Sequence, residues 1–552
     1  MAVVQTQIQK VSKWIVNLRY EDIPQEVIHL AKLQLLDCVA AICAGSRSSV
    51  GLKIKDALQT SEEGGSYTLL PFGEKWSLDN VLYYHAAMIN ALELDNFVFM
   101  GHIGQSSIPV SLALGETGNI SGRELLMALV ASEEVGGRFS ANLVSGPHQG
   151  HMRSFIHRVA GATAASKLSG HDEKTTANAL AIALSMPEFP LYPACFSPDT
   201  KVICTSPPTV EGVKASFMAA KGIEGPLDII ENPVGFFTYF SYSDFVPDIW
   251  KYLGATWTLY SLSTKNYAAC AYAQGPVSCA VDLKKEYAFS AEDIERIKIY
   301  APVVSVIMEK FSVPHYGSSV TPVNTHFSAV RSVAAALGYG ELTGDFYKAG
   351  NFEKTTGTIS ALSDKSQLLH DWQMTIDLLK GMDAGLVNPG KPGFLSLGSS
   401  QKTFSRFKKA FGSRPLVGWK DIYEIPKVPW NDQMYFFKRY ARSLMSFSDK
   451  WKSDKNTDFA FSHEGDLRKM VFNISARVEV TLKNGQKAES YCKLPAGFSD
   501  DDERDTVIRN KFMRETLPVW GEQKAIKVEK IIMNLDQLQS NDLMTAIRGS
   551  TS

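Results

Sequence analysis

The sequence predicts a mostly α protein with a large all-α helical domain and a smaller α+β domain. Apolar residues recur at helical spacing from the N-terminus to about residue 265, and segments such as residues 152–170, MRSFIHRVAGATAASKLSG, are rich in alanine. Small residues let helices approach closely, so we expect these helices to form a packed bundle. After about residue 275 the pattern changes to one typical of mixed helices and strands. A chain of 552 residues is too long for one simple core, which favours two domains.

Two segments of the N-terminal half show the helical pattern best. Residues 24–45, PQEVIHLAKLQLLDCVAAICAG, have Pro24 in the first turn, apolar residues at 3.6-residue spacing and Gly45 as a stop signal. Residues 77–95, SLDNVLYYHAAMINALELD, open with Ser77 as a candidate N-cap. We therefore expect a long helix in each segment.

The strand signals lie farther along the chain. Residues 290–302, SAEDIERIKIYAP, read as a short capped helix that turns into an alternating strand, and residues 476–495 alternate on both sides of Asn484-Gly485, a strong hairpin signal. Residues 524–538, KAIKVEKIIMNLDQL, are amphipathic helix again and are expected to return to the first domain.

These patterns divide the chain into two predicted domains. The all-α domain takes residues 1–266 and 500–552, and the α+β domain takes residues 267–499. A stretch at about 345–470, rich in aromatics, Lys, Pro and Gly, is expected to be an insertion in the second domain. It is either a surface addition, or a cover over a cleft or part of a subunit interface.

Composition excludes several classes of partner. With 45% apolar residues, 21% charged residues and a net charge of −1, nucleic acid and anionic membranes are poor candidates. The first residues lack the apolar core of a signal peptide, and no uninterrupted apolar run approaches a membrane span. Seven scattered cysteines without a CxxC pair exclude a zinc ribbon and predict reduced thiols in a cytoplasmic protein.

Common catalytic fingerprints are missing from the sequence. It has no GxxxxGK[ST] phosphate loop and no GxSxG nucleophile elbow, and the glycines of residues 338–344, GYGELTG, follow a helical rather than a strand pattern. His148 and His151 in HQGH lack an obvious third ligand, so we expect no metal site there.

A few polar residues nevertheless stand in contexts that cost stability. They are His102 in a glycine-rich loop after an acidic helix end, His151 before an alanine-rich helix, Lys201 on an irregular segment, Lys265 and Cys270 at the domain change, and Arg331 among small apolar residues. Taken singly, each fits an ordinary surface lysine, a satisfied histidine or an arginine whose stem covers apolar surface.

Taken together and in order, these segments resemble the MmgE/PrpD family, which includes 2-methylcitrate dehydratase, cis-aconitate decarboxylase and iminodisuccinate epimerase. The matching motifs are AKLQLLDCVAAICAG, NALELDNF followed by HIGQSSIPVSLALGE, HMRSFIHRVAGATAASKLSG, TKVICTSPPTVEGVKAS, KNYAAC, HFSAVRSVAAALGYG and VEVTLKNGQ…LPAGF. The resemblance covers about residues 25–345 and 475–535. It implies a helical domain built from both chain ends, an α+β lid domain, a cleft between them, a homodimer, and neither metal nor organic cofactor.

The resemblance also implies an active site and a substrate class. Carried over position by position, the site comprises His102, His151, Lys201 and Lys265 as catalytic residues and Glu93, Phe97, Cys270 and Arg331 as substrate-binding residues. The family acts on small di- and tricarboxylates. Histidines that titrate near neutrality suit proton transfer, and two lysines with an arginine would stabilise negative charge that grows on a carboxylate.

The chain departs from the family pattern at four places. Glu93 stands where most members have Asp, Phe97 replaces a small hydroxyl residue, Ile103 replaces the proline of a His-Pro-Gly loop, and Arg331 replaces a tyrosine. A guanidinium clamps a carboxylate but does not donate a proton near neutrality. Phe97 favours a substrate with an apolar arm, such as an alkylcitrate from secondary metabolism.

The sequence therefore predicts a cofactor-independent lyase for a citrate-, alkylcitrate- or aconitate-like acid, with dehydration ranked ahead of decarboxylation. Two alternatives stay open. One is an isomerase or epimerase of the same fold, and the other is a non-catalytic dimeric member whose insertion binds a partner.

Overall fold

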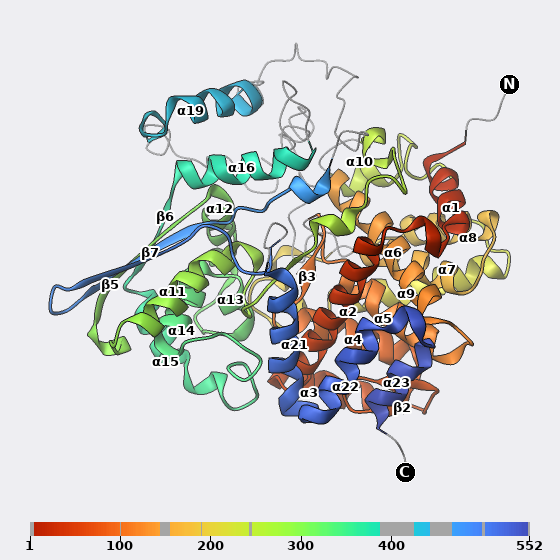
Figure 1. Ribbon diagram of the computed structural model, residues 1–552, viewed down its shortest axis with the longest axis horizontal. Coiled ribbons are helices and arrows are strands. Elements are labelled where there is room, and N and C mark those ends of the chain that lie inside the picture. Colours follow the sequence, from red (N-terminus) through yellow and green to blue (C-terminus); the bar gives the residue numbers. More distant parts are fainter. Residues whose placement is uncertain are drawn as a thin grey trace.

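The computed structural model describes residues 5–99, 101–143, 155–188, 190–241, 245–386, 424–441, 466–498 and 503–549. These residues form many helices and a few short strands in small sheets, which confirms the predicted mostly α fold class with a smaller α+β part. The helices of the N-terminal half are α1 (Gln7–Asn17), α2 (Gln25–Ser46), α3 (Ser49–Gln59), α4 (Leu78–Ala91), α5 (Gly104–Thr117), α6 (Gly122–Asn142), α7 (Ile156–Leu168), α8 (Glu173–Ser185), α9 (Ser206–Ala220) and α10 (Phe236–Phe240). Figure 1 shows them gathered on one side of the molecule.

Helix α2 is the core of this bundle. It packs against α4, α5 and α6, and almost all of its residues from Val27 to Ser46 are buried. Among the described residues it is the one helix long and apolar enough to cross a membrane, but 94% of its most apolar window is buried inside the protein. Gly45 is the residue before the last of α2, and a Cβ there would come within 2.4 Å of the Met88 carbonyl oxygen on α4. The expected stop signal is therefore a point of close helix contact.

The C-terminal helices return to the N-terminal bundle, as the amphipathic pattern predicts. Helix α21 (Arg504–Trp520) and helix α22 (Glu522–Met533) pack on α2, and α23 (Ser540–Arg548) packs on α5. In Figure 1 these blue helices lie among the red and orange ones. The division of the chain into two domains at the stated boundaries stays a prediction.

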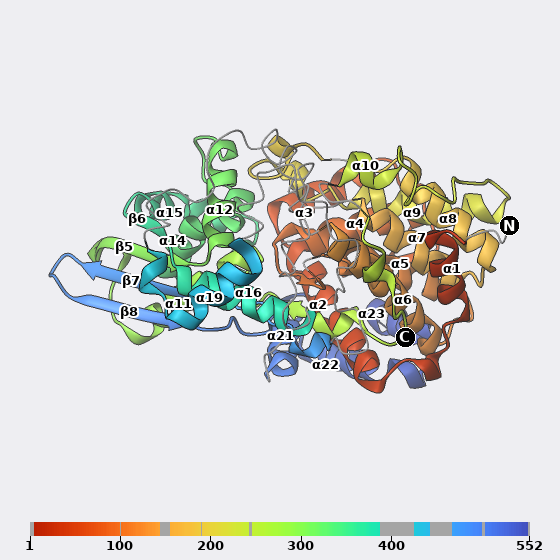
Figure 2. The ribbon, with the colours of Figure 1, turned by 90° about the horizontal axis from the view of Figure 1, so that it is seen from above.

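The second half of the chain is built around a four-stranded sheet of order β6-β5-β7-β8. The remaining helices and the strands of this sheet are α11 (Gln274–Glu286), β5 (Ile294–Ala301), α12 (Val303–Ser312), α13 (Pro322–His326), α14 (Ala329–Tyr339), α15 (Thr356–Ser363), β6 (Ser366–His370), α16 (Trp372–Leu386), α19 (Trp430–Phe436), β7 (Ala476–Leu482) and β8 (Lys487–Cys492). Helices α11 and α14 pack on the sheet, and Figure 2 shows this half beside the helical bundle.

The local strand signals are confirmed. A capping box at Ser290 starts a 3₁₀ turn that leads into β5, and the β7–β8 hairpin turns at Gly485 with φ of +85°. Strand β6 pairs in parallel with β5 from Ile297↔Ser366 to Ala301↔His370. The predicted insertion at 345–470 therefore contributes an edge strand to the sheet. Its residues 387–423 and 442–465 lie outside the described residues.

Two short strand pairs complete the fold. Strands β1 (Tyr67–Leu69) and β2 (Glu74–Trp76) form a hairpin before α4. Strands β3 (Asn96–Phe97) and β4 (Ser263–Thr264) pair antiparallel, Asn96↔Thr264 and Phe97↔Ser263. This second pairing joins the acidic turn after α4 to the segment that carries Lys265, so it brings two parts of the candidate site together.

A buried carboxyl in the bundle gives the fold a testable pH dependence. Glu133 of α6 is fully buried and accepts a hydrogen bond of 2.5 Å from Ser107 Oγ. Burial raises its pKa to about 8. Because an unfolded glutamic acid is ionised above about pH 4.3, folding takes up a proton between that pH and about pH 8. The contribution of Glu133 to the free energy of unfolding is therefore fully present below about pH 4.3. It falls by about 1.4 kcal/mol for each pH unit between that pH and about pH 8.

We expect Glu133→Gln to remove this loss. Glutamine keeps an acceptor for Ser107 and never ionises, so the variant should gain about 3 kcal/mol in free energy of unfolding at pH 7 and much less at pH 5. Urea denaturation at both pH values measures the change, with Glu295→Gln on the exposed side of β5 as the matched control. Equal pH slopes in wild type and Glu133→Gln would show that Glu133 is ionised in the folded protein.

Candidate active site

The candidate site begins at the acidic turn that follows α4. Glu93 has φ of +53°, in the left-handed region that non-glycine residues rarely adopt. Such a backbone costs about 1–2 kcal/mol and persists only where the surroundings hold it. The residue with this strained backbone is also buried, with 1% of its surface exposed. Glu93 is therefore held in place by its contacts, which include those with the two predicted lysines.

Two lysines meet the acidic turn in a fully buried ion cluster. Lys265 Nζ lies 2.7 Å from Glu93 Oε2 and 2.7 Å from Asp95 Oδ1, and Lys201 Nζ pairs with Glu93 Oε1. Lys201 also donates a 2.7 Å hydrogen bond to the carbonyl oxygen of Asn90. Both lysines are 0% exposed. Buried charges are tolerated only when paired, so the two cations and the two carboxylates neutralise one another.

The cluster ends at His102, which is its partly exposed member. His102 Nδ1 lies 2.6 Å from Asp95 Oδ2, and the His102 side chain is 17% exposed while that of Asp95 is 1% exposed. Gln105 Nε2 donates a 2.8 Å hydrogen bond to the same Asp95 oxygen. Asp95 therefore binds Nδ1 of His102 and fixes the orientation of the ring. The arrangement is a histidine oriented by a buried carboxylate.

Charge pairing keeps this carboxylate ionised. Burial alone raises the pKa of Asp95, but the charge of Lys265 and the contact with His102 outweigh burial and hold that pKa well below its ordinary value. For Lys265, burial lowers the pKa, yet Asp95 and Glu93 raise it well above its ordinary value. Asp95 and Lys265 thus stabilise each other's charged forms.

Cys270 lies beside the cluster as a protonated thiol. Burial, followed by the negative charge of Glu93, raises its pKa to about 12, and both lysines act in the opposite sense. Its backbone N–H donates a 2.9 Å hydrogen bond to the carbonyl oxygen of His326 at the end of α13. A neutral thiol of this kind is a weak nucleophile and a weak donor.

Phe97 forms an apolar wall next to His102. The two ring centroids are 6.2 Å apart. The Phe97 ring also packs edge-on against Phe472 at 5.4 Å and Phe498 at 5.5 Å, and the residue is 3% exposed. Other rings therefore cover much of the Phe97 side chain, and little of it is left to contact an apolar arm of a substrate.

Lys511 of helix α21 supports the site from behind the acidic turn. Its ammonium lies 2.5 Å from Asp37 Oδ1 and donates hydrogen bonds to the carbonyl oxygens of Leu94, at 2.8 Å, and Lys265, at 2.7 Å. It is 0% exposed. One buried cation thus ties the acidic turn, the Lys265 segment and α2 together.

The structure brings together six of the eight predicted site residues and places Arg331 elsewhere. Glu93, Phe97, His102, Lys201, Lys265 and Cys270 surround the cluster. The Arg331 guanidinium instead lies over the Tyr316 ring at 4.8 Å, and the acidic groups that act on it are Glu309 and Asp364. None of its described contacts is with the cluster. His151 lies outside the described residues.

Several site residues were missed from the sequence. Asp95 lies in the acidic turn after α4, seven residues before His102 in the sequence. This spacing is the signal that could have identified it as the partner of His102. Asn90 and Lys511 carry no such signal, because they reach the site only through the tertiary fold.

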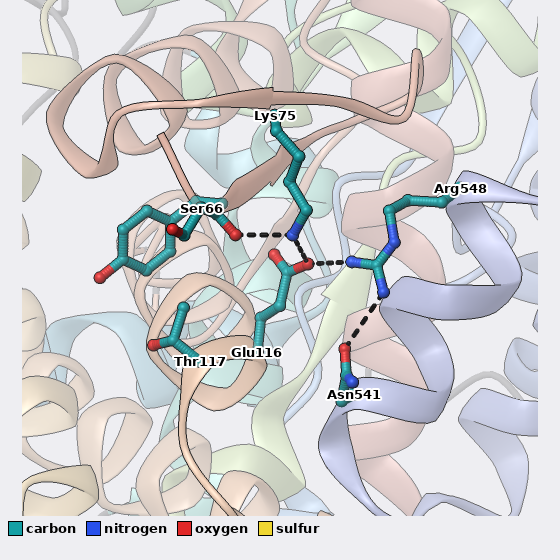
Figure 3. Close-up of a pocket in the computed structure, with 7 residues that line it drawn as sticks. Ser66, Lys75, Glu116, Thr117, Asn541 and Arg548 are labelled. Carbon is teal, nitrogen blue, oxygen red and sulfur yellow. Dashed lines mark hydrogen bonds and ion pairs between the residues drawn. The ribbon is translucent and has the colours of Figure 1, made fainter. Parts of the chain in front are cut away.

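A hollow on the surface offers a rival binding place. It has a volume of about 700 Å³ and is lined by Ser66, Tyr67, Lys75, Glu116, Thr117, Asn541 and Arg548. Figure 3 shows Lys75 and Arg548 both directed at the Glu116 carboxylate. Because Glu116 already pairs with both cations, this hollow has less charge left for an anion than its lining suggests.

Within the described ranges, no three His, Cys, Asp or Glu side chains are grouped as ligands for a metal ion. The acids of the candidate site have lysines as partners instead. The expected independence of metal and cofactor stays a prediction.

Comparisons with known proteins identify relatives of this chain at low sequence identity. Relatives include the cis-aconitate decarboxylase of Aspergillus terreus, 26% identical over 50% of this chain and 60% of the enzyme. A cis-aconitate decarboxylase-like protein of Aspergillus oryzae is 23% identical over 65% of this chain and 78% of that protein. The mouse cis-aconitate decarboxylase is 25% identical over 53% of this chain and 63% of the enzyme. The chain thus matches about 60% of the length of the A. terreus enzyme.

The family model of the MmgE/PrpD N-terminal domain matches residues 9–247, the segment that holds the helical bundle, the acidic turn, His102 and Lys201. The relatives extend the match beyond this segment. The match over residues 9–247 and the low-identity relatives together support a divergent member of the MmgE/PrpD family.

Proposed function

We propose that the chain is a cofactor-independent lyase that decarboxylates cis-aconitate or a closely similar polycarboxylate. The observation that carries the proposal is His102, partly exposed and oriented by Asp95 at 2.6 Å on a buried ion cluster. Support for the substrate class comes from the names of the three relatives described above, each of which is a cis-aconitate decarboxylase or a cis-aconitate decarboxylase-like protein.

The role that we propose for the lysines differs from the sequence expectation. Lys201 and Lys265 have carboxylates as partners and no exposed surface, so their charge is already compensated. Their proposed task is to hold Glu93 and Asp95 ionised and in place. Asp95 in turn orients His102, as a buried carboxylate does for a catalytic histidine.

The proposed reaction needs one proton for each CO₂ released. The bond between the methylene carbon and its carboxylate breaks, and CO₂ leaves. The electron pair of that bond moves through the double bond to the far carbon, which must be protonated. In our proposal, the His102 imidazolium donates this proton from Nε2 and recovers it from solvent after product release. General acid catalysis of this kind contributes roughly 10²–10⁴ in rate.

Decarboxylation now ranks ahead of dehydration because the relatives bear that name. Dehydration of a citrate-like acid and isomerisation or epimerisation of another carboxylic acid also need proton transfer of the kind proposed for His102, so they remain the alternatives. The position of Arg331 beside Tyr316 favours neither.

The expected homodimer and the cytoplasmic location are further parts of this proposal. Light scattering at several protein concentrations tests the dimer.

Product masses test the proposed function. Purified protein is incubated separately with cis-aconitate, citrate, 2-methylcitrate and a long-chain alkylcitrate. We expect cis-aconitate to give a product lighter by CO₂, at a rate that exceeds turnover of the three citrates. A product lighter by water from any citrate would establish dehydration instead. An unchanged mass with an altered NMR spectrum would establish isomerisation. Absence of any product would favour the non-catalytic alternative.

A further inference from the structure

His326 is a buried histidine next to the candidate site that no role yet explains. It is the last residue of α13 and is 0% exposed, and among the described residues neither ring nitrogen has a hydrogen-bond partner. Its ring lies 4.4 Å from that of Tyr347, whose hydroxyl also lacks a partner there. Buried polar atoms without partners cost free energy. An apolar ring would therefore suit this position better for folding alone.

Contacts on both sides tie His326 to the ion cluster. Its carbonyl oxygen accepts the 2.9 Å hydrogen bond from Cys270 N–H, and the ring of the next residue, Phe327, faces the Lys201 ammonium at 5.3 Å. The charges that act on the imidazole come from Lys201, Glu93 and Lys265. Burial and then Lys201 lower its pKa to about 3, while Glu93 acts in the opposite sense. The imidazole is therefore neutral near pH 7 and keeps one acceptor nitrogen.

Among the residues that the structure describes, the Lys201 ammonium has one N–H donor without a hydrogen-bond acceptor. An ammonium has three N–H donors, and Lys201 hydrogen-bonds Asn90 O and Glu93 Oε1. Its remaining side faces the Phe327 ring. A polycarboxylate bound at His102 would add negative charge beside Glu93 and Asp95, and that charge would attract the ammonium groups of Lys201 and Lys265 away from Glu93.

We propose that His326 is a positioning residue whose neutral imidazole accepts a hydrogen bond from Lys201 when an anionic substrate rearranges the cluster. The imidazole keeps the ammonium oriented without adding a third buried cation. This inference rests on the proposed function, since it concerns the same site during turnover.

Two replacements separate the acceptor from the ring. His326→Phe keeps a planar ring against Tyr347 and removes both nitrogens, whereas His326→Gln supplies an acceptor oxygen. We expect His326→Phe to unfold at the wild-type temperature or above, with kcat reduced roughly tenfold, the value of one hydrogen bond, and KM changed less than about threefold. His326→Gln should recover most of kcat. Tyr347→Phe, which removes only the hydroxyl, is the matched control and should retain wild-type kcat.

Each outcome decides the inference. Wild-type kcat in His326→Phe, or equal losses in the Phe and Gln variants, overturns the acceptor role while the wild-type enzyme remains active. Absence of wild-type turnover on every polycarboxylate overturns the proposed function together with this inference. The two failures are therefore distinguishable from the wild-type measurement alone.

Discussion

Replacing His102 with asparagine should reduce kcat for cis-aconitate by roughly 10²–10⁴, the range for loss of a general acid. Asparagine keeps a donor for Asp95 but carries no titrating nitrogen, so the cluster stays paired while the proton source is lost. Because the His102 side chain is 17% exposed and lies at the edge of the cluster, we expect little change in the unfolding temperature. Steady-state kinetics and thermal unfolding of the same preparation measure both effects.

The chain provides a matched control for this variant. His29 Nε2 lies 2.5 Å from Asp505 Oδ2, which makes a second histidine–carboxylate pair, but its side chains are 41% and 45% exposed. His29→Asn should retain wild-type kcat. Near-normal activity in His102→Asn, or an equal loss in both variants, would remove His102 from the proposed mechanism.

Replacing Lys265 with methionine should cost the most stability of any change in the site. It leaves Glu93 and Asp95, both 1% exposed, without the ammonium that binds them at 2.7 Å. Removing one partner of a buried ion pair typically costs 3–5 kcal/mol, because the remaining charge is left uncompensated. Activity should fall with it, since Asp95 would no longer be held ionised toward His102. Urea denaturation at pH 7 measures the loss of stability.

The pH dependence of this loss identifies its cause. In wild type the pKa of Asp95 is depressed, so its contribution to stability is present above its ordinary pKa and is lost only as the pH falls through the folded value. In Lys265→Met the stranded carboxylates should protonate more readily, so the difference from wild type should shrink between pH 7 and pH 5. Lys285→Met, which breaks the exposed pair with Glu341, is the control and should cost less than about 1 kcal/mol. A pH-independent loss in Lys265→Met would indicate lost packing instead of lost charge.

The parts of the fold that the sequence predicts are those encoded locally. Helix α2, the capped turn at Ser290 and the hairpin at Gly485 each depend on neighbouring residues, through apolar spacing, a side-chain cap or a left-handed glycine. The β3–β4 pair has no such signature, because each strand has two residues and the partners Asn96 and Thr264 are distant in the sequence. The parallel pairing of β6 is missed for the same reason.

For the candidate site too, local motifs predict some features and only the tertiary fold shows the others. Family motifs locate His102, Lys201 and Lys265, but only the fold shows that both lysines are paired with carboxylates. Arg331 stands at a motif position where the family has a tyrosine, and its side chain contacts Tyr316 instead of the cluster. Lys511 has no motif at all, since its partners come from α2, the acidic turn and the Lys265 segment.

A crystal structure of the protein with propane-1,2,3-tricarboxylate, which has no double bond to react, tests the central claim most directly. The claim is that the buried lysine–carboxylate cluster orients His102 toward a polycarboxylate. We predict a ligand carboxylate within hydrogen-bond distance of His102 Nε2, with Asp95 still bound to Nδ1. A ligand found only elsewhere, such as in the hollow between Lys75 and Arg548, would contradict the claim.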